Sequence, residues 1–376
     1  MATKKAPTKK APAAKVAAPA KKACGKKACA AKKPAPAKKA TSGKKVPVGS
    51  VKVYHEKDAS LDVLKGKTIA VLGYGAQGRA QALCMRDSGV NVIIGVRAGK
   101  SFKAAKADGF EVMSVDKAAK KADIIHILLP DEKHNEVYEK QIKKFVAPGK
   151  TLCCSHGFAY VFKAIVPPAD VDVIMVAPKG PGTEVRRVFE EGFGCPGLVA
   201  VFQDATGTAL QTALAIAKAE GLTRGGVLEC TMEQETYEDL FGEQNVLCGG
   251  LVDLMKYGFE TLTEAGYPPE MAYFECVHEA KLIVDIIYNK GIAAMNGVIS
   301  NTAEFGEYYN GPKIITPDVK KRMKESLVRI QTGKFAKDWL REAGKGAPTL
   351  AKKREQLGKH TVEIVGAEIR KMFERK

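Results

Sequence analysis

The stretch VLGYGAQGRA, Val71 to Ala80, joins a strand-like apolar segment to a helix-like segment and decides the fold of the first half. Its glycines follow the pattern Gly73-x-Gly75-x-x-Gly78. This spacing suits a tight turn, close approach of the backbone to a pyrophosphate and close packing of a helix on a strand. The phosphates would then lie at the N-terminus of the helix. The stretch therefore predicts a dinucleotide-binding turn.

The end of the next strand indicates which dinucleotide binds. A fold specific for NAD carries an acid there, roughly 20 residues after the glycines. In this chain the strand-like run from Val92 to Val96 leads into Arg97 and then Ser101. Because a cation and a hydroxyl suit a 2′-phosphate, the sequence favours NADP(H).

The rest of the chain falls into two patterns. Short apolar runs alternate with helical stretches up to about residue 230, which predicts an α/β Rossmann-type domain with a doubly wound parallel sheet. Beyond residue 231 helical spacing dominates, which predicts an all-α domain. The expected strands are 68–72, 91–96, 123–129, 151–154, 172–177 and 198–202, and the expected helices include 76–88, 205–219, 235–259, 269–289, 317–332 and 360–373. The predicted domains are 51–230 for NADP binding and 231–376 for metal binding, substrate binding and dimerisation, after a tail at 1–50.

The net charge of +18 is unevenly distributed along the chain. Residues 1–50 hold 15 lysines, no arginine and no acid, which leaves about +3 for the remainder. The Lys/Ala/Pro repeats of residues 1–46 have no apolar pattern to bury, so we expect disorder there. Their composition resembles the lysine-rich tails of linker histones and predicts non-specific binding to DNA, RNA or another polyanion. The alternatives are a tail that only aids solubility and a transit peptide.

No apolar run in the sequence is long enough to cross a bilayer. We therefore expect no membrane partner and a cytoplasmic location in a bacterium. A transit peptide would instead direct the chain to an organelle, but such peptides are rich in arginine and serine, and this segment has no arginine.

Two groups of acids in the helical half predict the chemistry. Glu235, Asp239 and Glu243 recur every four residues, so they share one face of a helix. Glu275 and Glu279 repeat that spacing on another largely apolar helix. A solvated face is the alternative, but few cations lie nearby in the sequence and like charges at this spacing repel. Carboxylates of this kind favour a hard divalent cation, Mg²⁺ above all.

Polar residues also stand at the ends of predicted strands in the first half. His156 follows one apolar run, Lys179 follows another within a Gly/Pro loop, and the run before Pro130 ends in Asp131 and Glu132. In a parallel sheet these strand ends meet at one crevice, where ligands bind. A lone histidine is more often structural, but two polar strand ends that face one crevice strengthen the functional interpretation.

Seven motifs in order identify a family resemblance: GYGAQG, ILLPDE, SHGF, MVAPKGPG, DLFGEQ, YFECVHE and ISNTAE. From about Val51 to the C-terminus the chain resembles ketol-acid reductoisomerase, also called acetohydroxy-acid isomeroreductase, in its short class I form. The resemblance implies a knotted helical domain and a homodimer with shared active sites, with higher oligomers also open. It implies that NADPH and two Mg²⁺ ions convert 2-acetolactate to 2,3-dihydroxy-3-methylbutanoate by alkyl migration followed by hydride reduction. The homologue 2-aceto-2-hydroxybutanoate would react likewise, giving the 3-methylpentanoate product in the valine and isoleucine pathways.

The resemblance also implies roles for individual residues. Asp239 and Glu243 would bind metal from one subunit, and Glu275 and Glu279 from its partner. His156, Lys179 and Glu235 would be catalytic, and Ser300 would contact the substrate. The implied cofactor contacts are Gly73, Tyr74, Gly75, Ala76, Gln77, Gly78, Arg97, Ser101, Asp131, Glu132, Lys133, His134 and Gly182.

Three positions depart from the family pattern. Ala76 stands where serine is common, Arg79 where histidine is common, and the loop from Arg97 to Phe102 is one residue short. These departures affect the phosphate contacts rather than the catalytic groups. Two other interpretations remain open: a reductase like the β-hydroxyacid dehydrogenases, which needs no Mg²⁺, and a nucleic-acid architectural factor.

Overall fold

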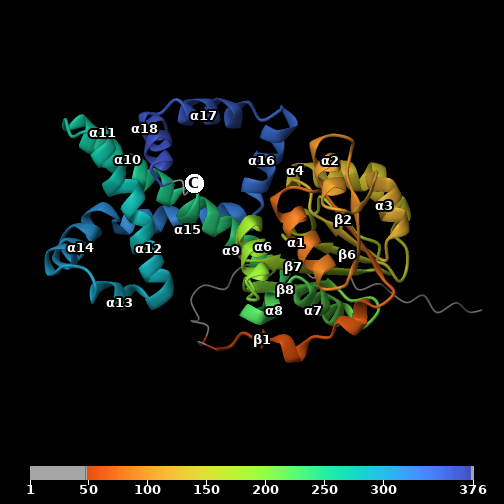
Figure 1. The fold of residues 1–376 in the computed structure, drawn as a ribbon. Helices are drawn as coiled ribbons and strands as arrows, with labels where there is room; N and C mark the ends of the chain where they lie inside the picture. The colour runs from red at the N-terminus through yellow and green to blue at the C-terminus, as the bar shows by residue number, and fades with distance from the viewer. Residues whose placement is uncertain (1–46, 48, 374–376) are drawn as a thin grey trace, which may run out of the picture. The chain divides into compact units, whose positions relative to one another are not determined.

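The computed structural model describes Pro47 and residues 49–373. The lysine-rich segment, and with it the predicted disorder and polyanion binding, lies outside the described residues. Within them, nine strands form one sheet in the order β1-β9-β8-β7-β6-β5-β2-β3-β4 (Figure 1). The strands are β1 (Val53–Tyr54), β2 (Thr68–Leu72), β3 (Asn91–Gly95), β4 (Glu111–Met113), β5 (Ile124–Ile127), β6 (Thr151–Cys154), β7 (Asp172–Pro178), β8 (Gly197–Gln203) and β9 (Val227–Glu229).

The six strands from β2 to β7 pair in parallel and follow the order expected of a dinucleotide-binding sheet. In sequence order they lie 3-2-1-4-5-6, so the chain reverses direction across the sheet between β2 and β5. The prediction of a wholly parallel sheet is wrong at one edge. There β8 runs antiparallel to β7, and β1 runs antiparallel to β9.

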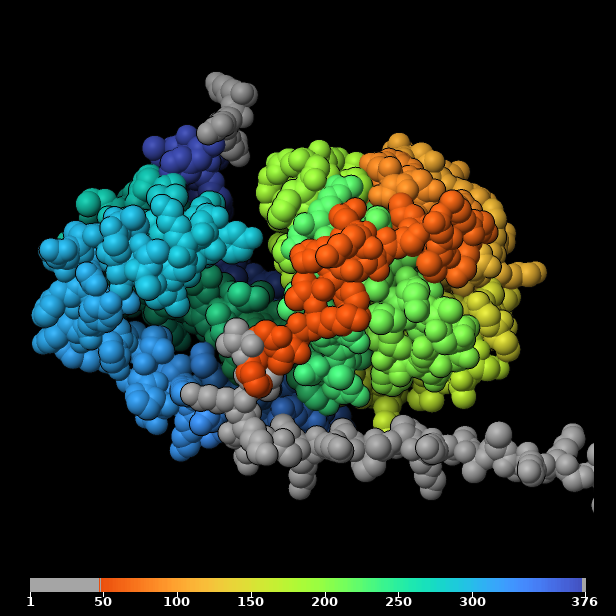
Figure 2. All heavy atoms as spheres, turned by 90° about the horizontal axis from the view of Figure 1, so that it is seen from below, coloured from red at the N-terminus to blue at the C-terminus, as the bar shows by residue number. Residues whose placement is uncertain are grey.

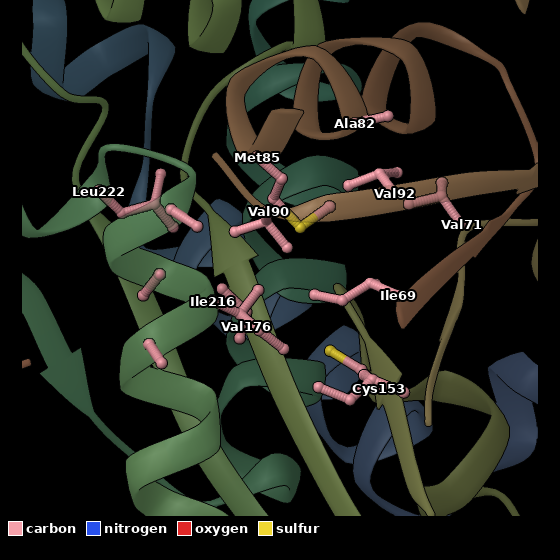
Figure 3. Packing of buried hydrophobic residues seen from close by; sticks show 14 of the residues in the cluster. Ile69, Val71, Ala82, Met85, Val90, Val92, Cys153, Val176, Ile216 and Leu222 are labelled. Atoms are coloured by element: carbon pink, nitrogen blue, oxygen red, sulfur yellow. The ribbon is translucent and has the colours of Figure 1, made fainter. Parts of the chain in front are cut away.

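Helices cover both faces of this sheet, because alternate residues along each strand point to opposite sides. Ile69 and Val71 join one buried cluster with α1 and α7, as Figure 3 shows. Ala70 and Leu72 join the other, with α3 and the π-helical turn η3. The helices of this half are α1 (Ala76–Asp87), α2 (Lys100–Ala107), α3 (Val115–Lys121), α4 (Asp131–Val137), η3 (Tyr138–Ile142), η4 (Lys143–Phe145), α5 (Phe158–Val161), α6 (Gly182–Glu190), α7 (Ala209–Ala219) and α8 (Leu222–Gly225).

The segment before β2 lies on the surface beside α7. It carries β1 and the short turns η1 (Glu56–Asp58) and η2 (Leu61–Leu64). Lys218 Nζ donates to the backbone carbonyls of Glu56 and Ala59 at 2.7 and 2.9 Å. Figure 2 shows this segment in red-orange against the green residues of α7 to β9.

The second half is helical, as predicted, but two of its expected helices are interrupted. The predicted helix 235–259 is divided by a π-helical turn at Glu243, and the predicted helix 269–289 by a π-helical turn at Phe274. The elements are α9 (Met232–Gly242), η5 (Glu243–Leu247), α10 (Gly250–Glu264), α11 (Pro269–Tyr273), η6 (Phe274–His278), α12 (Glu279–Lys290), α13 (Ile292–Asn296), α14 (Asn301–Ile314), α15 (Pro317–Gln331), α16 (Lys334–Gly344), α17 (Pro348–Gly358) and α18 (Thr361–Lys371).

Helix α9 is held against the strand ends by a small apolar cluster. Phe158 of α5 packs with Leu240 of α9, Ile330 of α15 and Ala336 of α16. A Cβ on Gly157 would lie 2.3 Å from the Thr236 hydroxyl, so glycine permits this close approach. The acids of α9 are thereby brought to the carboxyl ends of β6 and β7.

Among the described residues, no helix combines the length and the apolar character needed to span a membrane.

Candidate active site

The glycine-rich turn links β2 to α1 at the point where the strand order reverses. Gly73 has φ +110°, and a Cβ there would lie 2.3 Å from the Leu128 carbonyl oxygen. A Cβ on Gly78 would lie 2.4 Å from the Gly73 carbonyl oxygen. Gly75 is exposed, with nothing within 4 Å of a Cβ position, and no side chain caps α1. The free N-terminal amides of α1 are therefore open to an anion such as a pyrophosphate.

Two side chains near this turn donate hydrogen bonds to the carboxylate of Asp108. The Tyr74 hydroxyl donates to Asp108 at 2.7 Å, and Arg79 donates two hydrogen bonds to the same carboxylate at 2.7 and 2.9 Å. Arg97 is exposed and Ser101 half-buried at the start of α2. Arg97, two residues after the end of β3, is not bonded to Asp108.

The first turn of α4 places Asp131 to His134 at the end of β5. His134 is buried, and its Nε2 donates to the Leu129 carbonyl at 2.8 Å. Burial lowers the pKa of His134, which keeps the ring neutral. Burial raises the pKa of Asp131, and the charge of His156 opposes that rise. Asp131 therefore lies within electrostatic reach of His156, as expected for two strand ends at one crevice.

Four predicted site residues meet where β6, β7 and α9 come together. Glu235 is buried, with 1% of its side chain exposed. His156 Nδ1 lies 3.1 Å from Glu235 Oε2 and 3.4 Å from Asp239 Oδ2. Lys179 Nζ donates to Glu235 Oε1 and to Asp239 Oδ1, both at 2.8 Å. We call these four residues the acid–base cluster.

The protonation states in the acid–base cluster support one another. Burial alone would lower the pKa of His156, but Glu235, Asp131 and Asp239 raise it on balance. Burial also opposes the charge of Lys179, yet Glu235 and Asp239 raise its pKa. Burial alone would raise the pKa of Glu235, but His156 and Lys179 hold that pKa below the ordinary range. Glu235, His156 and Lys179 are therefore stabilised in their charged forms.

Glu235 and Asp239 have a cationic partner that the sequence did not predict. Few cations lie near Glu235 and Asp239 in the sequence, but Lys179, some 60 residues earlier, neutralises both in the folded chain. The acid–base cluster remains suited to ligand binding, because His156 Nε2 is buried without a hydrogen-bond partner in the described part of the chain. Such a ring nitrogen is available to an oxygen of a bound molecule.

Candidate ligand atoms for a divalent cation lie within the acid–base cluster and beside it. His156, Glu235 and Asp239 each offer one ligand atom within 4.8 Å of the others. Burial and the charge of Asp239 raise the pKa of Glu243. A cation bound between the two carboxylates would oppose that rise. Donors of this type suit Mg²⁺.

The structure does not bring the remaining predicted residues to this cluster within one chain. Glu275 in η6 and Glu279 at the start of α12 are both exposed. Ser300 is exposed and caps α14, where its Oγ accepts from the Ala303 amide at 3.1 Å. For the residues that the structure describes, neither acid forms an ion pair with the acid–base cluster.

A row of buried and half-buried polar side chains near the site was not predicted from the sequence. Gln81 is fully buried and bonded to Gln77, and Ser155 immediately precedes His156. The signal was present: two glutamines four residues apart on a helix that is otherwise apolar on that face.

Two domain families match this chain. The acetohydroxy acid isomeroreductase NADPH-binding domain matches residues 63–226, and the ketol-acid reductoisomerase C-terminal domain matches residues 232–375. The chain belongs to the ketol-acid reductoisomerase family. This confirms the resemblance found in the sequence, together with the Rossmann-type first half and the helical second half.

Named relatives of the family differ in their dinucleotide. The chain is 79% identical over 323 residues to ketol-acid reductoisomerase (NADP(+)) of Akkermansia muciniphila, covering 86% of this chain and 99% of the relative. It is 59% identical over 332 residues to ketol-acid reductoisomerase (NAD(+)) of the uncultured archaeon GZfos26G2, covering 87% of this chain and 100% of the relative. Coverage of nearly the whole length of both relatives fits the short form.

Solved structures agree with the fold. The structure of an NADH-preferring ketol-acid reductoisomerase from an uncultured archaeon matches with a TM-score of 0.84 and 59% identity, over 86% of this chain and 100% of that one. A semialdehyde dehydrogenase NAD-binding protein from Cupriavidus necator matches with a TM-score of 0.55 at 20% identity, over 70% of this chain and 99% of that one. The second likeness shows only the shared fold.

Proposed function

We propose that this chain is an NADPH- and Mg²⁺-dependent ketol-acid reductoisomerase that acts on 2-acetolactate and 2-aceto-2-hydroxybutanoate in valine and isoleucine biosynthesis. The observation that carries the proposal is the meeting of His156 and Lys179 with Glu235 and Asp239. These groups lie at the carboxyl edge of the sheet, where the glycine-rich turn also lies. The reaction needs charge stabilisation and fixed geometry more than a nucleophile, and this arrangement supplies both.

Asp239 and Glu243 are the residues of one chain that would hold the metal, with Glu275 and Glu279 contributed by a second chain. When bound, Mg²⁺ supplies Lewis-acid polarisation of the substrate oxygens, and the reduced dinucleotide supplies a hydride. The requirement for several acids favours this chemistry over simple dehydrogenation, for which metal ligands would be superfluous.

The protein side chains then control protons and orientation. Protonated His156 can donate from Nε2 to a substrate oxygen, because Glu235 holds the opposite ring nitrogen at 3.1 Å. Lys179 is held by two carboxylates at 2.8 Å, so its ammonium is directed into the same region. Glu235 orients both cations from a buried position, and Ser300 would contact the substrate from α14.

Removal of metal tests this proposal. With 2-acetolactate as substrate, we expect NADPH oxidation to fall at least about 100-fold in EDTA and to recover when excess Mg²⁺ is added. NADPH binding, measured by calorimetry in EDTA, should persist because the glycine-rich turn is separate from the acids. Undiminished turnover in EDTA would instead support a metal-independent reductase.

Relatives of this chain are named for either dinucleotide, so the family alone does not fix the preference. The proposed preference for NADPH rests on Arg97 and Ser101. We expect Arg97→Asp combined with Ser101→Asp to shift the ratio of kcat/KM for NADPH over NADH by at least about tenfold toward NADH, through repulsion of the 2′-phosphate. Lys120→Asp, which adds an acid on exposed α3, is the matched control and should leave the ratio unchanged. An unchanged ratio in the double variant would mean that other residues recognise the phosphate.

A dimer is proposed because the helical half leaves large apolar side chains exposed. Tyr288 is 82% exposed, Phe305 68% and Ile292 65%. Exposed apolar surface of this kind is characteristic of an interface. A second copy of the chain is the proposed occupant, because Glu279 shares α12 with the exposed Tyr288. Among the described residues, neither Glu275 nor Glu279 belongs to a group of side chains that could hold a metal.

The lysine-rich tail suggests a second property, non-specific binding of nucleic acid. Residues 1–46 precede both matched domains, the first of which begins at residue 63. We expect deletion of residues 1–46 to leave turnover unchanged and to abolish DNA retardation in a gel, a retardation that should weaken steeply with salt in the full chain. Replacement of the tail lysines by glutamine is the control for length. If the full chain fails to retard DNA at low salt, this property is absent.

A further inference from the structure

A continuous row of polar groups runs beneath the active site and links β5 and α1 to the loops that follow β6 and β7. It begins at His126 in β5, whose Nε2 lies 3.3 Å from the Ser155 hydroxyl. Ser155 reaches Gln81 of α1 at 3.2 Å, and Gln81 reaches Gln77 at 3.0 Å. Gln77 ends the row on the Gly180 carbonyl at 2.8 Å. We call these five residues the polar row.

The direction of every bond in the polar row is set by its last member. The Gly180 carbonyl can only accept, so Gln77 must turn its amide nitrogen toward Gly180 and its amide oxygen toward Gln81. Gln81 then donates to Gln77 and offers its own oxygen to Ser155. The Ser155 oxygen is left to accept from His126 Nε2. The polar row is therefore a one-way chain of donors.

His126, the first member of the polar row, is suited to act as its first donor. His126 is fully buried, and burial lowers its pKa to about 3, so the ring stays neutral and donates from one nitrogen only. Gln81 is also fully buried, with both ends of its amide engaged. A bond lost here leaves buried polar groups without partners, which is costly.

The polar row meets the active site at three places. Gln77 belongs to the glycine-rich turn, and Gly180 directly follows Lys179. The backbone of the loop also packs on the turn, since a Cβ on Gly182 would lie 2.3 Å from the Ala76 carbonyl oxygen. Ser155 directly precedes His156, so the row joins the turn to both cationic members of the acid–base cluster.

We propose that Gln81 is a positioning residue, which holds the dinucleotide turn against the Lys179 loop through Gln77 and against the His156 strand end through Ser155. The inference rests on the proposed function, because it concerns how the dinucleotide is placed against the acid–base cluster. Gln81 itself touches neither. If Gln81 had a purely structural role, its substitution would lower stability alone. If it positions the turn, the substitution would also weaken NADPH binding.

Gln81→Met tests the proposal, because methionine matches the length of glutamine and removes both hydrogen bonds. We expect the dissociation constant for NADPH, measured by calorimetry on the metal-free full-length protein, to rise about tenfold. The kcat with 2-acetolactate and Mg²⁺ should fall as well, since the Lys179 loop loses its fixed position.

Gln203→Met is the matched control. Like Gln81, Gln203 makes two side-chain hydrogen bonds, here donated to the carbonyls of Pro168 and Val171. It lies at the opposite edge of the sheet, beside Val173 at the start of β7. Its loss should lower the Tm and leave NADPH binding unchanged. If Gln81→Met lowers the Tm to the same extent and keeps the wild-type dissociation constant, the positioning role is refuted.

A second pair of variants covers the case in which Gln81→Met does not fold. Ser155→Ala removes the hydroxyl and both of its bonds in the row, to His126 and to Gln81, whereas Ser155→Thr keeps the hydroxyl. We expect the alanine variant to weaken NADPH binding and the threonine variant to retain it, and equal affinities for the two would overturn the proposal. A wild-type protein that binds no dinucleotide, or does not convert 2-acetolactate, would refute the proposed function before any variant is compared.

Discussion

Asp239→Asn should abolish turnover of 2-acetolactate, with a loss of at least about 1,000-fold, or roughly 4 kcal/mol of transition-state stabilisation. Asp239 is the only acid of the cluster that is both partly exposed and placed beside Glu243, so it is the best candidate to share a metal within the described chain. The amide keeps the shape of the carboxylate but loses its charge, and a neutral oxygen is a poorer ligand for Mg²⁺.

The same variant should leave the fold and the dinucleotide site intact. Lys179 keeps its second partner, Glu235, at 2.8 Å, so no buried cation is left alone. NADPH affinity should stay within about twofold of the wild-type value, because Asp239 is not part of the glycine-rich turn. Asp62→Asn, which removes an exposed acid paired with Lys65, is the matched control and should retain full turnover.

A titration of His156 gives a readout that does not depend on turnover. Burial lowers the pKa of this ring, while Glu235, Asp131 and Asp239 together raise it above the ordinary value. Loss of the Asp239 charge should therefore lower the pKa of His156, as measured by NMR in the metal-free protein. Retained isomerisation by Asp239→Asn would remove the proposed metal assignment, whatever the titration shows.

The sequence predicted local structure well where a pattern repeats over many residues. The run from Thr68 to Leu72 coincides with β2, and the helix expected from Ala76 begins at that residue. Buried parallel strands have continuous apolar runs, which stand out from the helices between them. β1, β4 and β9 were missed because each has only two or three residues, too few to show alternation.

Direction and helix continuity were not predictable in the same way. Nothing in residues 198–202 reveals that β8 pairs antiparallel with β7, because strand direction depends on where the connecting chain leads. The π-helical turns at Glu243 and Phe274 insert into amphipathic stretches without changing their composition. Such turns are frequent at functional sites, and both of these carry predicted metal ligands.

The candidate site was predictable as a set of residues but not as a set of contacts. Strand-end position identified His156 and Lys179, and helical spacing identified Glu235 and Asp239. That Lys179 bonds to both acids depends on how α9 packs against the sheet, which spacing within α9 does not encode. The polar row was overlooked for the same reason, since Gln81 and Ser155 are 74 residues apart in the chain.

Two inactive variants should restore activity to each other if the active site is shared between subunits. Asp239→Asn damages the acids of α9, and Glu275→Gln damages the acid proposed to come from the partner. In a heterodimer of the two, one site carries both lesions and the other carries neither. Co-expressed with different tags and purified through both, the heterodimer should therefore show about half of the wild-type turnover per dimer.

The exposure of the second group of acids is the physical reason for this expectation. Glu275 and Glu279 are exposed, and apolar neighbours such as Met271 and Leu282 are 59% and 48% exposed. Carboxylates amid an exposed apolar surface are well placed to reach a site that a second chain completes. Within one chain they have no contact with Asp239 among the residues described.

The reciprocal heterodimer makes the experiment decisive. A chain that carries both substitutions is paired with a wild-type chain, so a shared site is damaged once in each half of the dimer and turnover should be lost. If each active site lay within a single chain, the wild-type chain would keep about half of the activity here, and the first heterodimer would have none. A shared site and a site within one chain therefore predict opposite activities for the two heterodimers. Poor expression or low stability of one variant cannot reverse that pattern.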